Sequence, residues 1–208
     1  MPTYSIEISK TIGHIASRWQ EADKSILRKL FPLLAEGKPI SPTRFAQTTD
    51  KDVVTVEKAL QIGRTDRDDY GRVIELFGVM LIPTPHRIMV EGVALFSCCA
   101  MVSQMVPSLV GKDATVESID AINNKVVKIR ISPKSIRSVE PKDAVATFVM
   151  TNQEDVLRDV RSAFCSHVRH FINTETAREF IRMNPKRYIV GMDQLHQIAR
   201  QLQDMIWG

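Results

Sequence analysis

The sequence predicts an α+β protein in which a winged-helix-like N-terminal domain, residues 1–82, precedes a thiol-bearing domain, residues 83–208. Apolar residues recur at helical spacing up to residue 62, alternating strand patterns follow from residue 72, and helical spacing returns after residue 155. An apolar fraction of 44% and a charged fraction of 25% are typical of a globular chain with a buried core. Together these patterns indicate a sheet flanked by helices.

Four helices followed by two strands are expected first. Helical spacing places the helices at residues 6–19, at 25–31, from 42 onward and at 50–62. Gly37 is expected to end the second helix, and Ser41 as N-cap with Pro42 as first residue begins the third. After a polar turn at residues 66–71, strands at 72–76 and 87–91 are expected to form a hairpin. This order of elements is that of a winged helix.

A winged helix often binds DNA, but the charge of this one argues for a structural role. Acidic and basic residues nearly cancel on the expected recognition helix, which carries Asp50, Lys51, Asp52, Glu57 and Lys58. The net charge of +4 is mild, whereas a phosphate-contacting face is clearly basic. We therefore expect no nucleic-acid partner, and a regulator that senses metal through its cysteines stays as an alternative.

The second domain is expected to begin with a buried helix over residues 95–106, ended by Pro107 and Gly111. Alternation over residues 114–119 and 125–131, separated by Asn123–Asn124, predicts a β-hairpin. Further elements are expected as a strand at residues 144–150 and helices at 155–171, 174–183 and 193–206.

Three cysteines cannot form a full disulfide framework, which predicts a reducing, cytoplasmic location. The first residues show neither a basic segment nor an apolar one, so no secretion signal is expected. The longest apolar stretch, residues 88–102, is interrupted by Glu91, Gly92 and Ser97, so no membrane association is expected.

The cysteines stand in apolar surroundings. Cys98 and Cys99 are adjacent, where an expected strand gives way to a helix, and helix N-termini lower the pKa of a thiol. Cys165 is followed by His167 and His170, positive groups that favour a thiolate. A buried cysteine is most often a small apolar side chain. Paired thiolates in an apolar pocket, however, suit the capture of a soft metal.

Three other sites fit the cysteines less well. Cys165, His167 and His170 do not have a usual zinc spacing, and on a helix the first two point about 200° apart. A Cys–His hydrolase needs an oriented base and an oxyanion hole, and the sequence shows neither. Cys98–Cys99 is not the Cys-x-x-Cys of thioredoxin-like proteins.

Three collinear blocks resemble the alkylmercury lyases (organomercurial lyases). The first has that family's Cys-Ala-(Leu/Met), proline and Leu-x-Gly, and the last its Val-Arg-x-x-Phe-Cys-x-His-Val. The middle block is similar to its Ser-Pro…Ile…Val-x-Pro segment. The blocks are Phe96–Gly111, Ile131–Pro141 and Val160–Val168. The resemblance extends over residues 26–171 and is poor beyond Thr174.

The resemblance implies a winged-helix-like domain packed on a core domain with an irregular antiparallel sheet. It implies that Cys99 and Cys165 bind the mercury of an organomercurial, R–Hg⁺, and that no cofactor is needed. The products would be a hydrocarbon and Hg²⁺ on the two thiolates, later removed by cellular thiols or a mercuric reductase. Such chemistry suits a soft metal, and the departing carbon needs a proton from a positioned acid.

The sequence departs from the family three residues after Cys99, where Val102 replaces the aspartate that supplies this proton. Ser103 shares the helix face of Cys99 and is interpreted as an auxiliary catalytic group. Cys98 is interpreted either as a bystander or as a substitute proton donor. An alternative function is therefore the binding of a soft metal or organometal with weak or altered lyase activity.

Overall fold

An antiparallel sheet lies over successive layers of helices in the computed structural model, which describes residues 2–183 and 186–208. In spatial order its eight strands are β1 (Asp66–Arg67), β2 (Val73–Leu76), β3 (Val79–Met80), β5 (Val93–Ser97), β4 (His86–Val90), β6 (Ala114–Ile119), β7 (Val126–Ile131) and β8 (Ile136–Glu140). A smaller sheet has the order β10 (His170–Phe171), β9 (Val145–Val149) and β11 (Arg187–Gly191). The predicted α+β class is confirmed.

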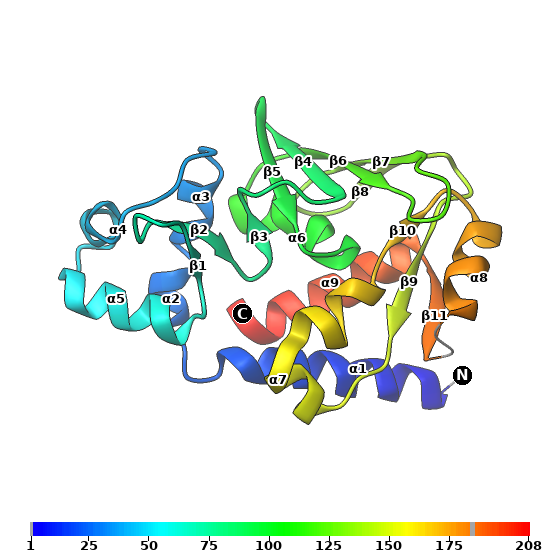
Figure 1. The fold of residues 1–208 in the computed structure, drawn as a ribbon, viewed down its shortest axis with the longest axis horizontal. Helices are drawn as coiled ribbons and strands as arrows, with labels where there is room; N and C mark the ends of the chain where they lie inside the picture. The colour runs from blue at the N-terminus through cyan, green and yellow to red at the C-terminus, as the bar shows by residue number, and fades with distance from the viewer. Residues whose placement is uncertain (1, 184–185) are drawn as a thin grey trace.

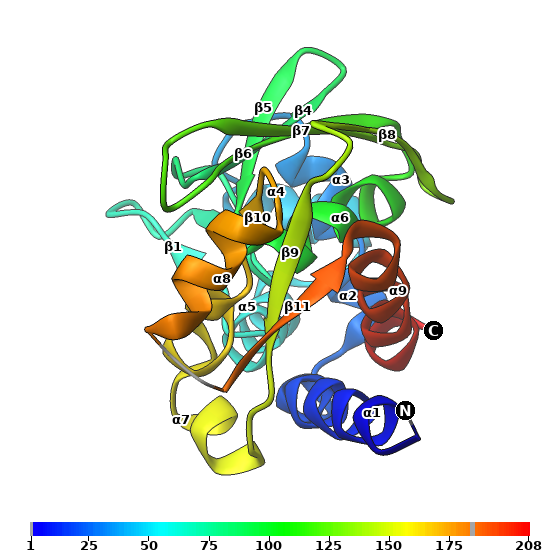
Figure 2. The same ribbon diagram turned by 90° about the vertical axis from the view of Figure 1, so that its right-hand side faces the viewer.

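The helices separate into two groups (Figures 1 and 2). Beside β1 and β2 lie the short helices α2 (Lys24–Leu27), α3 (Leu30–Leu34), α4 (Pro42–Thr49) and α5 (Val53–Ile62). Beneath the sheet lie, in order, α6 (Ala100–Val110), α9 (Met192–Trp207) and α1 (Pro2–Ala16), with α7 (Gln153–Ala163) against α1. The remaining helix, α8 (Thr174–Arg182), covers the smaller sheet. Short 3-10 turns occupy Ser17–Trp19 and Cys165–His167.

Local sequence signals explain the elements that were predicted correctly. Ser41 Oγ accepts a hydrogen bond from the Arg44 N–H with Pro42 in the first turn, so α4 begins where expected. Gly37 and Gly111 both have φ of +73°, the left-handed conformation that ends a helix. The predicted hairpin of β6 and β7 is formed, with Val116 opposite Ile129.

Three predictions about individual elements are wrong. The strands expected to form a hairpin, β2 and β4, do not pair with each other. Strand β2 pairs with β3 through a tight turn at Phe77 and Gly78, whose positive φ angles suit such turns. Strand β4 pairs with β5 and β6.

The expected helix over residues 95–106 is strand β5 up to Ser97 and helix from Ala100, because a short apolar run fits either state. Pro107 lies inside this helix, which ends at Val110 before Gly111. Helix α7 ends at Ala163, and the chain then forms a 3-10 turn and β10, which pairs with β9.

The two halves of the chain share their packing. Strand β3 pairs with β5, so the main sheet continues across residue 82, and α1 packs on α9. One buried cluster contains side chains from both halves, for example Phe31 and Trp207, whose rings meet edge to face at 5.3 Å. The division into residues 1–82 and 83–208, and the winged-helix description of the first part, stay predictions. Within the described residues, every helix is too short or too polar to cross a membrane.

Candidate functional site

The three cysteines meet at the wall of one cavity of about 230 Å³, between β2, α6 and α7. Their sulfur atoms all lie within 4.8 Å of one another. Cys98 Sγ is 3.3 Å from Cys165 Sγ, although the two residues are 67 positions apart in the sequence. Within the described part of the chain, this is the group of His, Cys, Asp or Glu side chains whose geometry suits a metal ion.

Backbone hydrogen bonds hold the two cysteine segments together. The Cys98 N–H donates to the Gly78 carbonyl at 2.9 Å, which fixes the end of β5 against the β2–β3 turn. The Ala100 N–H donates to the Val168 carbonyl at 3.0 Å, which joins the first turn of α6 to the segment after Cys165. Cys99 is the N-cap residue of α6 in extended conformation, so its sulfur lies near the free N–H groups of that helix.

Cys99 is the cysteine that ionises most readily. Burial opposes its ionisation, but the thiols of Cys165 and Cys98 and the N–H groups of Val102 and Met101 favour the thiolate, so the pKa of Cys99 is well below its ordinary value. Hydrogen bonding with Cys165 and Cys99, together with burial, raises the pKa of Cys98. Cys165 accepts from Cys98, which favours its ionisation, but hydrogen bonding with Cys99 and burial outweigh this and raise its pKa. Ionisation of the cluster therefore begins at Cys99.

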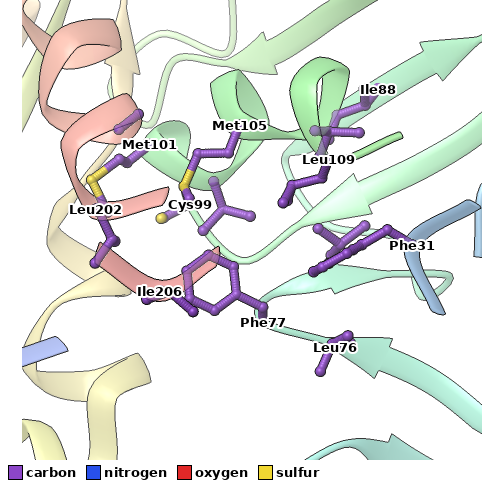
Figure 3. Close-up of a cluster of buried hydrophobic side chains, with 14 of the residues drawn as sticks. Phe31, Leu76, Phe77, Ile88, Cys99, Met101, Met105, Leu109, Leu202 and Ile206 are labelled. Atoms are coloured by element: carbon purple, nitrogen blue, oxygen red, sulfur yellow. The ribbon is translucent and has the colours of Figure 1, made fainter. Parts of the chain in front are cut away.

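The surroundings of Cys99 are apolar and rich in sulfur. Figure 3 shows Cys99 at the start of α6 beside Met101 and Met105, with Leu202 of α9 close by. Cys99 is fully buried, and Cys165 is 7% exposed. Such a setting excludes water and favours a soft, weakly hydrated metal over hard cations, which need oxygen ligands.

Ser103, predicted as an auxiliary group, is fully buried on α6, and its hydroxyl donates to the Ala100 carbonyl at 2.7 Å. It is absent from the described residues that line the cavity, whereas Val102 is present. Its hydroxyl satisfies the helix backbone because a serine in mid-helix bonds readily to a carbonyl one turn back. The auxiliary role of Ser103 stays a prediction, and in this arrangement its hydroxyl bonds its own helix.

Cys98 was interpreted as a bystander or a substitute donor, and the structure places it in contact with Cys165. The histidines that follow Cys165 bond to other partners. His167 Nδ1 accepts from the Arg187 guanidinium at 2.8 Å, and the buried His170 bonds Ser118 and Gln104. The Cys–His–His arrangement weighed for zinc is not formed.

Sequence reasoning assigned no role to two charged residues of this cavity, Glu75 on β2 and Arg161 on α7. Arg161 Nη2 lies 2.9 Å from Glu75 Oε2 and also pairs with Asp66. A single glutamate within the apolar strand Val73–Leu76 is the signal in the sequence that marks this position.

Gly78 keeps this wall of the site open. Its φ is +76°, and a Cβ there would overlap Cys98 Sγ. We expect Gly78→Ala to displace Cys98 and to lower the free energy of unfolding by more than the roughly 1–2 kcal/mol of left-handed strain. Urea unfolding measures this.

The matched control for this prediction is Gly71→Ala, because Gly71 has φ of +74° and open space around its Cβ position. Gly71→Ala therefore measures the cost of the left-handed backbone alone, without an overlap with a neighbouring side chain. Equal losses in the two variants would contradict the proposed contact, and adding Cys98→Ala to Gly78→Ala is expected to recover the difference.

Comparisons with known proteins agree on one family. The family model for alkylmercury lyase (MerB) matches residues 81–204. An alkylmercury lyase of Staphylococcus epidermidis is 33% identical over 178 residues, which are 85% of this chain and 81% of the relative. One of Bacillus cereus is 32% identical over 86% of this chain and 81% of the relative.

A solved structure described as the mercury-bound form of MerB2 has the same fold, with a TM-score of 0.76 at 16% identity, covering 95% of this chain and 99% of that one. The family match spans Cys98, Cys99 and Cys165, the residues that the fold brings to one cavity. The chain therefore belongs to the alkylmercury lyase family.

Proposed function

We propose that this protein cleaves the carbon–mercury bond of organomercurials by protonolysis, giving a hydrocarbon and Hg²⁺. The observation that carries the proposal is the cluster of three sulfur atoms within 4.8 Å, at the wall of one cavity in a chain from this family. Thiolates are the protein ligands that a soft metal such as mercury prefers. Cys99 and Cys165 are the proposed catalytic and mercury-binding residues.

The ionisation of the cluster suggests the order of steps. An organomercurial reaches the protein as R–Hg–SR′, where R′S is a cellular thiolate. The Cys99 thiolate attacks the mercury first, because its lowered pKa makes Cys99 the thiol of the cluster that ionises most readily. The displaced thiolate R′S⁻ takes the proton of the Cys165 thiol and leaves as R′SH. Cys165 then binds the mercury as a second thiolate.

Cleavage of the carbon–mercury bond follows. Its electron pair stays with the carbon, which takes up a proton and leaves as RH. The mercury remains Hg²⁺ throughout, held between Cys99 and Cys165, so no oxidant, reductant or cofactor takes part. Two thiolates on the metal weaken the bond to carbon by donating electron density to the mercury.

Release of Hg²⁺ requires competing thiolates, because the product complex of two protein thiolates is itself stable. Cellular thiols, or a mercuric reductase that accepts the ion, are the proposed recipients. A reducing cytoplasm, which keeps the three cysteines free, is the proposed location.

Methylmercury with excess thiol tests the proposal. We expect methane in the headspace at one equivalent for each Hg²⁺ formed, with repeated turnover. Tight stoichiometric binding of methylmercury without methane would overturn the lyase function. It would support the alternative, a soft-metal or organometal binding protein altered at Val102.

A further inference from the structure

Protonolysis needs an acid beside the departing carbon, and the cavity wall offers few candidates. Val102 cannot carry a proton, and the Ser103 hydroxyl is bonded to its own helix. The Cys98 thiol faces the cluster, but its raised pKa makes it a weak acid. Glu75 is a carboxyl on the same wall, and its side chain is only 8% exposed.

Gly78 connects Glu75 to the sulfur atoms. The Gly78 N–H donates to Glu75 Oε1, and a Cβ on Gly78 would overlap Cys98 Sγ. A Cβ at Gly78 would lie 3.5 Å from Val102 Cγ2. The carboxyl group of Glu75 is thus separated from Cys98 and from Val102 by the width of a single glycine.

Two carboxyls share one guanidinium in this corner of the cavity. Arg161 Nη2 contacts both Asp66 Oδ2 and Glu75 Oε2. The Asp66 side chain is 49% exposed, whereas the Glu75 side chain is 8% exposed, so a negative charge on Glu75 loses more of its hydration. Of the two carboxyls, Glu75 is therefore the one whose burial favours the protonated form.

The acidity of Glu75 suits proton donation at neutral pH. Burial is the main cause that raises its pKa to about 7, and the charge of Asp66 adds to it, while the Gly78 N–H and Arg161 act in the opposite direction. Arg18 and Cys165 also interact with this carboxyl electrostatically. The other charged groups that line the cavity are Arg64, Arg158 and Asp159.

We propose that the Glu75 carboxyl group donates the proton that the departing carbon receives. This rests on the proposed carbon–mercury cleavage. The carboxyl O–H bond breaks as the electron pair of the carbon–mercury bond forms the new C–H bond. The resulting carboxylate is stabilised by the Gly78 N–H and the Arg161 guanidinium, which already contact its two oxygen atoms. Solvent at the cavity mouth returns the proton to Glu75.

Single-turnover cleavage of methylmercury, with protein in excess, tests this role. We expect Glu75→Gln to lower the rate of methane release by a factor of roughly 100 to 10,000, as for loss of a general acid. One equivalent of Hg²⁺ should still bind, which shows that the variant is folded. Glu57→Gln is the matched control, because Glu57 forms a similar pair with Arg67 outside the cavity. Its rate should stay within about twofold of the wild type.

The pH profile separates a proton donor from a structural carboxylate. The wild-type rate should fall about tenfold per pH unit above the pKa of Glu75, and Glu75→Gln should lack this fall. Asp66→Asn should move the fall to lower pH, because it removes the negative charge that helps to raise the pKa of Glu75. An unchanged profile in Glu75→Gln would overturn the proposal.

A second acid placed at Val102 gives an independent test. Adding Val102→Asp to Glu75→Gln should restore methane release. Adding Val102→Asn to Glu75→Gln should not, because asparagine has the shape of aspartate but carries no acidic proton. If wild type releases methane and Glu75→Gln keeps its rate within threefold, the assignment of Glu75 fails and the lyase function stands. If wild type releases no methane, the lyase function itself fails.

Discussion

Replacing either Cys99 or Cys165 with serine is expected to abolish methane release from methylmercury. A hydroxyl is a hard ligand and stays protonated near neutral pH, so it neither attacks mercury nor donates electron density to it. Because the two thiolates act on one metal, each single change should lower the rate by a factor of roughly a thousand or more. Headspace analysis of methane under saturating methylmercury measures this.

The two variants should fail at different stages. Cys99→Ser removes the group that ionises most readily, so methylmercury should bind slowly as well as stay intact. Cys165→Ser keeps the Cys99 thiolate, so one equivalent should bind and remain uncleaved. Ser166→Ala is the control, because the Ser166 hydroxyl is exposed and donates to the Ser162 carbonyl. Substantial methane from either serine variant would contradict the proposed pairing.

The cysteine pair was predictable from sequence blocks, and the rest of the cavity was not. Cys99 and Cys165 stand in two motifs that resemble one family, and their meeting needs only that the family fold be kept. The position of Glu75 depends on how β2, β3 and α7 pack, because Arg161 reaches it from 86 residues away. The contact of Cys98 with Cys165 likewise depends on side-chain directions at the junction of β5 and α6.

The fold divides in the same way between local and distant causes. Caps and glycines mark the ends of α4 and α6 and lie within a few residues of the backbone groups that they satisfy. Which strands pair, in contrast, depends on residues that are far apart in the sequence. The expected hairpin failed because Phe77 and Gly78 allow an earlier turn, and β4 then pairs with β5 and β6.

A chain of buried polar groups links the main sheet to the smaller one. The Gln104 amide nitrogen lies 3.1 Å from His170 Nε2, and Ser118 Oγ lies 2.9 Å from Nδ1 of both His170 and His86. All four side chains are at most 1% exposed. The Gln104 amide N–H donates to His170 Nε2, so the His170 Nδ1–H donates to Ser118. The Ser118 hydroxyl then donates to His86 Nδ1, and both rings are neutral in this arrangement.

Acidification is expected to destabilise the protein through these histidines. Burial lowers the pKa of His170 to about 3, and burial followed by the charge of His170 lowers the pKa of His86. Below about pH 6.5 these two histidines bind protons in the unfolded chain but stay neutral in the folded state. Each histidine should therefore lower the free energy of unfolding by about 1.4 kcal/mol per pH unit. Urea unfolding at about pH 7 and about pH 5 measures the change.

Other titrating groups also contribute to this pH dependence, and Glu75 opposes the histidines. Glu75 has a raised pKa, so the folded state binds its proton before the unfolded chain does and gains stability as the pH falls. The Cys99 thiolate acts in the same direction as the histidines, because its proton is bound more readily in the unfolded chain. Glu75 and Cys99 therefore partly cancel. Burial also lowers the pKa of His167 and of His196, which act in the same direction as the two buried histidines.

Single variants resolve these contributions. His86→Phe keeps an aromatic ring and removes one titrating group, so its stability should depend less steeply on pH by about 1.4 kcal/mol per unit. Glu75→Gln should depend more steeply, because it removes the opposing group. A wild-type slope left unchanged by His86→Phe would show that this imidazole takes up its proton equally in the folded and unfolded states. A steeper slope in Glu75→Gln would show by equilibrium unfolding that the folded protein holds a proton at Glu75, as proton donation to a departing carbon requires.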